Sequence, residues 1–284
     1  MIRVKAPAKI NLTLDVLSKR SDGYHDVKMV MTTIDLADYV SVKKNNTNEI
    51  RITSNSFRIP LSEENLTHKA AKLFKIAYNI NTGVDINIEK NIFISAGLAG
   101  GSSDAAATLK GLRELFKVDC TDEELAVIGG EIGSDIPFCI YGGTAIATGR
   151  GEIINPIKSP PKCWVILVNP RIGVPTREIF DNFTAENIMD IDTDGMTTAI
   201  EKACFSSVCA SLGNSLESVT FKLYPEVAKI KNKLTDAGAE GVLMSGSGPT
   251  IFGLVYTEKK ANAVFKQTKS LFPKYDVHMV RLLG

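Results

Sequence analysis

The feature that most constrains this fold is a loop of glycines and small hydroxyl residues between a strand pattern and a strong helix pattern. Val84, Ile86 and Ile88 alternate along one face of the expected strand. The loop, residues 95–104, reads SAGLAGGSSD, and the alanine-rich run after it opens the expected helix. Converging backbone N–H groups and the helix dipole make such a junction an anion site, for which phosphate is the natural ligand. Taken alone, the loop is equally compatible with a tight connection whose glycines only supply positive φ angles.

Hydrophobic periodicity elsewhere predicts strands and helices in both halves of the chain, and therefore an α+β fold of mixed sheets with helices packed on them. In the first half we expect β hairpins over roughly the first 45 residues with a turn at 21–23, a helix over 63–80, and helices that open at Ala105 and after a capping box at Thr121. A short element over 134–140 and a strand between the glycines at 142–143 and 149–151 follow. In the second half we expect a strand over 164–168, helices from 176 to 237, and two final strands that flank a helix carrying Phe265.

The proline-rich stretch at 156–161 reads as an interdomain linker. We therefore expect two domains, residues 1–157 and 158–284.

Composition limits the classes of partner. The 284 residues carry a formal net charge of +1, which gives no large field for nucleic acid or an anionic membrane. The amino terminus lacks the apolar run of a signal peptide, and no uncharged apolar stretch approaches the ~20 residues that span a bilayer. Five cysteines without a C-x-x-C pair favour a reducing cytoplasm, and Cys204 and Cys209 read as buried thiols. The sequence leaves open whether the chain is a monomer or a homodimer.

Two further segments contain residues that are unusual for their surroundings. Lys9 lies in an otherwise apolar strand pattern, where a charge is costly unless it meets a partner. Near the carboxyl end, residues 244–250 place a second loop of small residues between apolar segments. Neither the Walker-type loop nor the dinucleotide fingerprint fits, because no Gly-Lys-Ser/Thr ending is present and the 95–104 loop lies mid-chain after several strands.

Together these segments resemble the three motifs of the GHMP kinase superfamily, in the same order and over essentially the whole chain. Four segments more narrowly resemble the branch whose acceptor is a cytidine-diphosphate derivative of methylerythritol, in non-mevalonate isoprenoid synthesis. They are PAKINL at 7–12, RSDGYH at 20–25, EIGSDIPF at 131–138 and GRGE at 149–152.

The resemblance implies an ATP-dependent kinase that uses Mg²⁺ and phosphorylates a hydroxyl of the acceptor. It also implies that residues 1–157 bind ATP and that the substrate site lies between this domain and residues 158–284. It implies that Asp135 orients or deprotonates that hydroxyl and that Lys9 holds Asp135 ionised and steadies developing charge. The ATP phosphates would lie on Ser95, Ala96, Gly97, Leu98, Ala99, Gly100, Gly101, Ser102, Ser103 and Asp104. The acceptor would contact Asn11, Tyr24, His25, Thr176 and Phe180. The sequence nominates no protein ligand for the magnesium ion.

Competing interpretations remain open at this stage. Asp135 alone reads as a helix cap or a solvated carboxylate, and Lys9 as a lysine that extends out of the sheet. Asp104 places a negative charge near the phosphates, so its carboxylate either points away or helps to arrange magnesium. The acceptor is instead mevalonate, homoserine or galactose if the chain belongs to a sister branch. A non-catalytic nucleotide-binding protein is the alternative from another class.

Overall fold

The computed structural model describes residues 1–283, which form two compact units that interleave along the chain. The first unit comprises residues 1–8, 36–94 and 99–142, and the second comprises 9–35, 95–98 and the described residues from 143 onward. The division falls within two long strands, β1 (Ile2–Lys19) and β2 (His25–Lys44), and within the glycine-rich loop.

The first unit is a mixed sheet covered by helices. The end of β2 pairs antiparallel with β4, from Tyr39 opposite Glu89 to Lys44 opposite Val84, and β3 pairs parallel with β4. Helices α1 and α2 pack on each other, and Phe74 of α1 and Leu109 and Leu112 of α2 are fully buried. Beyond β1 and β2, the elements are β3 (Ile50–Ser54), α1 (Leu66–Ala77), β4 (Val84–Glu89), α2 (Gly100–Phe116), α3 (Asp122–Gly130) and α4 (Ile136–Tyr141).

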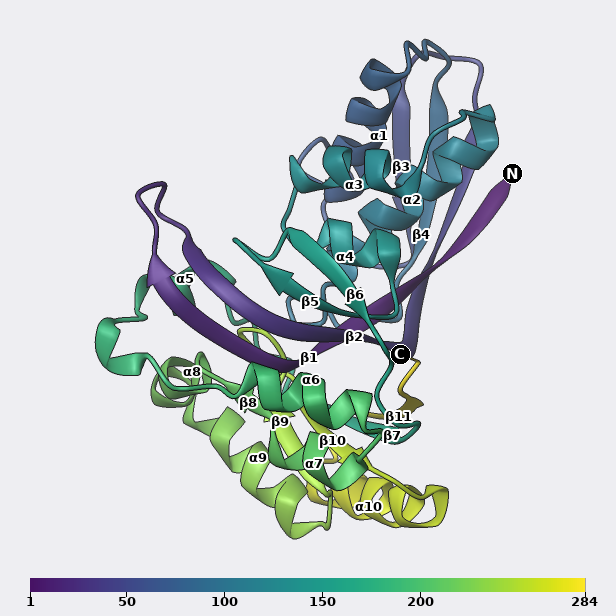
Figure 1. Ribbon diagram of the computed structural model, residues 1–284. Coiled ribbons are helices and arrows are strands. Elements are labelled where there is room, and N and C mark those ends of the chain that lie inside the picture. Colours follow the sequence, from purple (N-terminus) through teal and green to yellow (C-terminus); the bar gives the residue numbers. More distant parts are fainter. Residues whose placement is uncertain (284) are drawn as a thin grey trace. The chain divides into compact units, whose positions relative to one another are not determined.

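The second unit contains an antiparallel sheet in the order β11-β7-β10-β9, with α9 and α10 packed on it (Figure 1). It also contains the pairing of β2 with β5, of β5 with β6, and a short parallel contact of β1 with β8. Its elements are β5 (Thr144–Thr148), β6 (Ile153–Ile157), β7 (Trp164–Asn169), α5 (Thr176–Asp181), the 3-10 helix η1 (Ala185–Asn187), α6 (Thr193–Glu201), α7 (Phe205–Ala210), β8 (Gly213–Asn214), α8 (Glu217–Leu223), α9 (Pro225–Asp236), β9 (Gly241–Met244), β10 (Ile251–Val255), α10 (Glu258–Leu271) and β11 (Asp276–Arg281).

The α+β class with mixed sheets and packed helices is confirmed, as are the amino-terminal hairpin and the capping box, in which Thr121 and Glu124 bond reciprocally. Helix α2 differs from expectation because it begins at Gly100 and not at Ala105. The first two residues of the expected linker, Pro156 and Ile157, belong to β6. The domain boundary at 157/158 stays a prediction.

In the part of the chain that the structure describes, every helix is too short or too polar to cross a membrane.

Candidate active site

The glycine-rich loop enters α2 through residues in the left-handed region. Ser95, Gly97 and Ala99 have φ values of 53°, 74° and 54°. Left-handed residues at a turn bring neighbouring N–H groups round to one side, which is the arrangement of anion-binding nests. Ser103 makes the first intrahelical bond of this turn, from its N–H to the carbonyl of Ala99 at 2.9 Å. The N–H groups of Gly100, Gly101 and Ser102 have no partner within the helix. They point out of its amino terminus, so they are available to an anion.

The two loop serines have different surroundings. The Ser103 side chain is buried and its Oγ donates to the carbonyl of Pro7 at 2.7 Å, which ties α2 to β1 within the first unit. Ser102 is only half-buried. The hydroxyl proton of Ser103 is therefore committed to the backbone, and Ser102 is the serine better placed to donate to a ligand.

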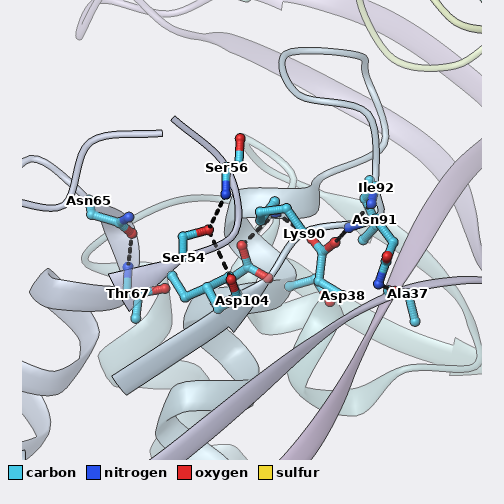
Figure 2. Close-up of polar contacts among 12 residues, drawn as sticks. Ala37, Asp38, Ser54, Ser56, Asn65, Thr67, Lys90, Asn91, Ile92 and Asp104 are labelled. Atoms are coloured by element: carbon cyan, nitrogen blue, oxygen red, sulfur yellow. Dashed lines mark hydrogen bonds and ion pairs between the residues drawn. The ribbon is translucent and has the colours of Figure 1, made fainter. Parts of the chain in front are cut away.

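Asp104 points to Lys90, the residue that directly follows β4 and precedes the loop. Its Oδ2 lies 2.6 Å from Lys90 Nζ, and Asp38 also contacts that ammonium (Figure 2). Of the two expectations for Asp104, this ion pair favours a carboxylate that points away from the phosphates, and a role in arranging magnesium stays a prediction.

In the second unit, a buried lysine lies beside a buried amide. Lys9 is 4% exposed and its Nζ donates to Oδ1 of Asn11 at 2.7 Å. Nδ2 of Asn11 in turn lies 3.1 Å from the sulfur of Met29 on β2. Burial excludes the interpretation in which Lys9 extends out of the sheet to water. Because a buried ammonium is costly unless it has partners, the bond to Asn11 is part of what stabilises it, and the catalytic role expected for Lys9 stays a prediction.

Three segments far apart in the sequence meet in this unit: Lys9–Asn11, the loop at 95–98 and the loop at 244–250. The Lys9 N–H donates to the carbonyl of Leu98 at 3.2 Å, and Ser245 Oγ donates to the carbonyl of Gly97 at 2.9 Å. A Cβ on Gly246 would lie 3.2 Å from the Gly97 carbonyl oxygen and 3.7 Å from Asn11 Oδ1. The three motifs that the sequence singled out are thus neighbours.

Gly97 is the position where this convergence leaves no room for a side chain. A Cβ there would lie 2.1 Å from the carbonyl oxygen of Ser245, and the φ of 74° is itself strained for any other residue. Gly97→Ala is therefore expected to destabilise the protein by more than the ~1–2 kcal/mol that a left-handed alanine costs, and to weaken nucleotide binding. Urea unfolding and MgADP titration measure both effects.

Gly23→Ala is the matched control for this prediction, because Gly23 has a φ of 87° but no atom within 4 Å of its Cβ position. It reports the cost of φ alone. Equal losses of stability in the two variants would show that the contact with Ser245 does not matter.

The loop at 244–250 is held by side chains that include Asn214 and Thr176. Asn214 on β8 is buried, and its Nδ2 donates to the carbonyls of Met244 and Gly246 at 2.9 and 2.8 Å. Ser247 is hydrogen-bonded to Thr176 through their hydroxyls at 3.0 Å. The bond brings Thr176, an expected acceptor residue, to the edge of this loop.

Two of the expected acceptor residues are in ring contact. The His25 and Phe180 rings lie 5.3 Å apart between centroids at an interplanar angle of 34°, and Phe183 lies edge-on to His25 at 6.1 Å. His25 is 8% exposed, and burial lowers its pKa below the ordinary value, with Lys19 as a smaller cause. The imidazole is therefore neutral at neutral pH, so it offers one donor and one acceptor nitrogen.

Tyr24 presents an open aromatic face next to this group. Its side chain is 55% exposed, and the guanidinium carbon of Arg150 lies over the ring at 5.2 Å. Arg20 bonds Asp22 and Asp26 at 3.1 and 2.8 Å, which fixes the turn that displays Tyr24. A planar base needs such a face for stacking.

Asp135, in the first unit, occupies the N-cap position of α4, but its side chain makes no capping hydrogen bond. The carboxylate is half-buried. The interpretation of Asp135 as a helix cap is therefore not supported. Lys9 belongs to the other unit, and the joint role expected for the two residues stays a prediction.

Four residues that the sequence did not suggest as site residues contact the residues described above. They are Asp38, Lys90, Phe183 and Asn214. Asp38 carried a usable signal, because it is a charge in an apolar strand pattern just as Lys9 is.

Within residues 1–283 no group of three or more His, Cys, Asp or Glu side chains is placed to hold a metal ion. A magnesium ion that enters with a nucleotide requires no such group, because phosphate oxygens and water supply most of its ligands.

Comparison with known proteins defines the class. The sequence model of the GHMP kinases N-terminal domain matches residues 65–143, and that of the GHMP kinases C-terminal domain matches residues 196–274. A solved homoserine kinase from Cytophaga hutchinsonii has the same fold, with a TM-score of 0.82 at 19% identity over 99% of this chain and 94% of that one. The fold and the glycine-rich loop are those of a GHMP kinase.

Relatives with higher sequence identity identify the family within this class. The chain is 52% identical to the 4-diphosphocytidyl-2-C-methyl-D-erythritol kinase of Bacillus cytotoxicus over 99% of this chain and 96% of the relative. It is also 52% identical to that of Geobacillus thermodenitrificans, over 100% and 97%. A crystal structure of 4-(cytidine 5'-diphospho)-2C-methyl-D-erythritol kinase covers all of both chains with a TM-score of 0.84 and 30% identity. The chain belongs to the family of 4-diphosphocytidyl-2-C-methyl-D-erythritol kinases.

Proposed function

We propose that this chain transfers the γ-phosphoryl group of ATP to the 2-hydroxyl of 4-diphosphocytidyl-2-C-methyl-D-erythritol in non-mevalonate isoprenoid precursor synthesis. The observation that carries the proposal is 52% identity over the full chain to kinases of that name. The neighbouring motifs around Lys9, Gly97 and Ser245 support a working enzyme. The five cysteines are free thiols, which is consistent with the cytoplasm as its compartment.

ATP enters as its magnesium complex, and its phosphates bind the loop from Ser95 to Asp104. The left-handed residues of the loop and the amino terminus of α2 supply N–H donors, and the Ser102 hydroxyl supplies another. A magnesium ion bound with the nucleotide would neutralise part of the charge on the phosphate oxygens.

The acceptor's cytosine stacks on Tyr24 and Phe180, and its polar edge bonds the neutral imidazole of His25. The support is the ring contact of His25 with Phe180, the exposed face of Tyr24 and the lowered pKa of His25. Asn11 and Thr176 add polar contacts to the sugar-alcohol end of the acceptor.

Phosphoryl transfer depends on positioning and on cancellation of charge on the moving oxygens. Asp135 orients the acceptor hydroxyl and accepts its proton as the oxygen–phosphorus bond forms. Lys9 stabilises the ionised carboxylate and the negative charge that develops on the transferring group. The amide of Asn11 holds the Lys9 ammonium in place, since the two are hydrogen-bonded in a buried environment.

The direct test is ATP turnover by the purified protein with Mg²⁺, with 4-diphosphocytidyl-2-C-methyl-D-erythritol, mevalonate, homoserine and galactose as acceptors. We expect ADP release with the cytidyl acceptor alone. Release with another acceptor would retain the kinase and discard the cytosine contacts. No release with any acceptor, together with tight MgADP binding, would favour a non-catalytic nucleotide-binding protein.

Phe180→Ala is expected to raise KM for the cytidyl acceptor by about tenfold or more, because one base–aromatic stack contributes about 1–3 kcal/mol. The KM for ATP is expected to stay unchanged. Phe265→Ala on α10 is the matched control, as it removes an aromatic ring of similar partial burial that has no proposed ligand contact. Equal KM values for wild type and Phe180→Ala would remove Phe180 from the acceptor site.

A further inference from the structure

Two buried carboxylates share one buried ammonium at the base of the glycine-rich loop. The Lys90 side chain lies between Asp38 and Asp104, as Figure 2 shows, and contacts both. Exposures of the three side chains are 6%, 0% and 5% for Lys90, Asp38 and Asp104. With both carboxylates ionised, this Asp38–Lys90–Asp104 cluster has a net charge of −1 and little solvent to screen it.

The two carboxylates are not equally well satisfied as anions. Oδ1 of Asp38 accepts the backbone N–H groups of Asn91 and Ile92, the latter at 2.8 Å, while its Oδ2 contacts Lys90. Oδ1 of Asp104 is buried and has no hydrogen-bond partner. The negative charge is therefore better tolerated on Asp38, and Asp104 is the carboxylate that takes a proton.

The titration of Asp104 agrees with this assignment. Burial raises its pKa to about 7, the ammonium of Lys90 opposes the rise and the charge of Asp38 adds to it. The charged groups that face Asp104 are Lys90, which directly follows β4, and Asp38 from β2. Lys90 itself remains protonated: burial lowers its pKa, but the two carboxylates raise it above the ordinary value.

The cluster contacts both ends of the glycine-rich loop. Ile92, bonded to Asp38, is where the chain departs toward the loop, and Asp104 lies on the helix that receives it. Lys90 Nζ is 3.4 Å from the Cβ position of Gly100, the first residue of α2. The ammonium thus touches the helical turn where the proposed phosphate site begins.

We propose that Asp38, Lys90 and Asp104 are positioning residues for the nucleotide, and that binding of phosphates at the start of α2 is coupled to uptake of one proton by Asp104. The inference rests on the proposed ATP site. Phosphate brings further negative charge to a cluster that already has one carboxylate in excess. Protonation of Asp104 removes that excess, while Lys90 and Asp38 keep the loop ends in place.

The direction of the pH dependence follows because proton binding by Asp104 and phosphate binding are thermodynamically linked. Phosphate binding raises the pKa of Asp104 above its value in the free protein, so the protonated protein binds more tightly. The Kd for nucleotide is constant below the pKa of the free protein and increases as pH rises through it, by at most about tenfold per pH unit.

The test is calorimetric titration of the full-length protein with MgADP at pH 7.5, in two buffers of different ionisation enthalpy. Wild type is expected to take up on the order of half a proton more than Asp104→Asn. The comparison cancels titration of the nucleotide, which is common to both proteins. The Kd of Asp104→Asn is also expected to vary less between pH 6.5 and 8.5 than that of wild type.

Asp85→Asn is the matched control, because Asp85 is a paired carboxylate on β4 outside the cluster, and its proton uptake should equal that of wild type. Equal uptake by wild type and Asp104→Asn would overturn the coupling and leave the ATP site intact. Absence of MgADP binding to wild type would overturn the ATP site, and the coupling with it. A wild-type Kd that is independent of pH above 7 counts against the coupling without any variant.

Discussion

Asp135→Asn is expected to lower kcat by about 10²–10⁴-fold while the Kd for MgADP stays within about twofold of wild type. Asparagine keeps the size of the side chain and is itself a good residue for the N-cap position, so α4 is not disturbed. It removes the negative charge and the proton-accepting oxygen that the acceptor hydroxyl requires. Steady-state turnover with the cytidyl acceptor and calorimetric titration with MgADP measure the two quantities.

Asp122→Asn is the control for this prediction, because Asp122 is also half-buried at the start of a helix, where it pairs with Arg113 at 2.8 Å. Its turnover should remain near that of wild type. Turnover of Asp135→Asn within a few-fold of wild type would show that another group, or solvent, accepts the proton.

Local signals predicted the elements around the site but not the start of α2. The capping box at Thr121 and the alternation in β4 depend on residues a few positions apart, so they are visible in the sequence. Gly100 and Gly101 are poor helix formers, so propensity placed the helix start at Ala105. Tertiary contacts override propensity here, since Ser103 bonds Pro7 and Gly101 packs near Leu66 of α1.

The burial of Lys9 could be anticipated because a charge in an apolar strand demands a partner. The same rule applied to Asp38 would have marked it as buried. It would not have found Lys90, which is 52 positions away from Asp38 and follows a strand in the way that many surface lysines do. Such a pairing exists only once the sheet has formed.

Asn214 and Phe183 had no signal in the sequence. Asn214 lies on a strand of two residues, too short for any periodicity, and its carbonyl partners are about thirty positions away. Phe183 lies two residues after the end of α5, where an aromatic residue reads as an ordinary packing residue. The acceptor side of the site was therefore predicted from the resemblance, and its supporting residues come from the fold.

Lys9→Met is expected to separate activity from stability. Methionine keeps most of the aliphatic stem of this buried side chain and removes the ammonium. Because a buried charge contributes little net stability, the free energy of unfolding should change by no more than about 1–2 kcal/mol. The kcat should fall by about 10²–10³-fold, because the ammonium is proposed to stabilise the charge that develops in the transition state.

Urea unfolding and steady-state turnover provide the two measurements, and Lys19→Met, at the exposed end of the same strand, is the control that should change neither. A structural lysine would produce the opposite pattern, with a large loss of stability and an activity per folded molecule close to wild type. Natural proteins retain a destabilising buried charge where function requires it, so a variant as stable as wild type but nearly inactive is the result that assigns Lys9 to catalysis.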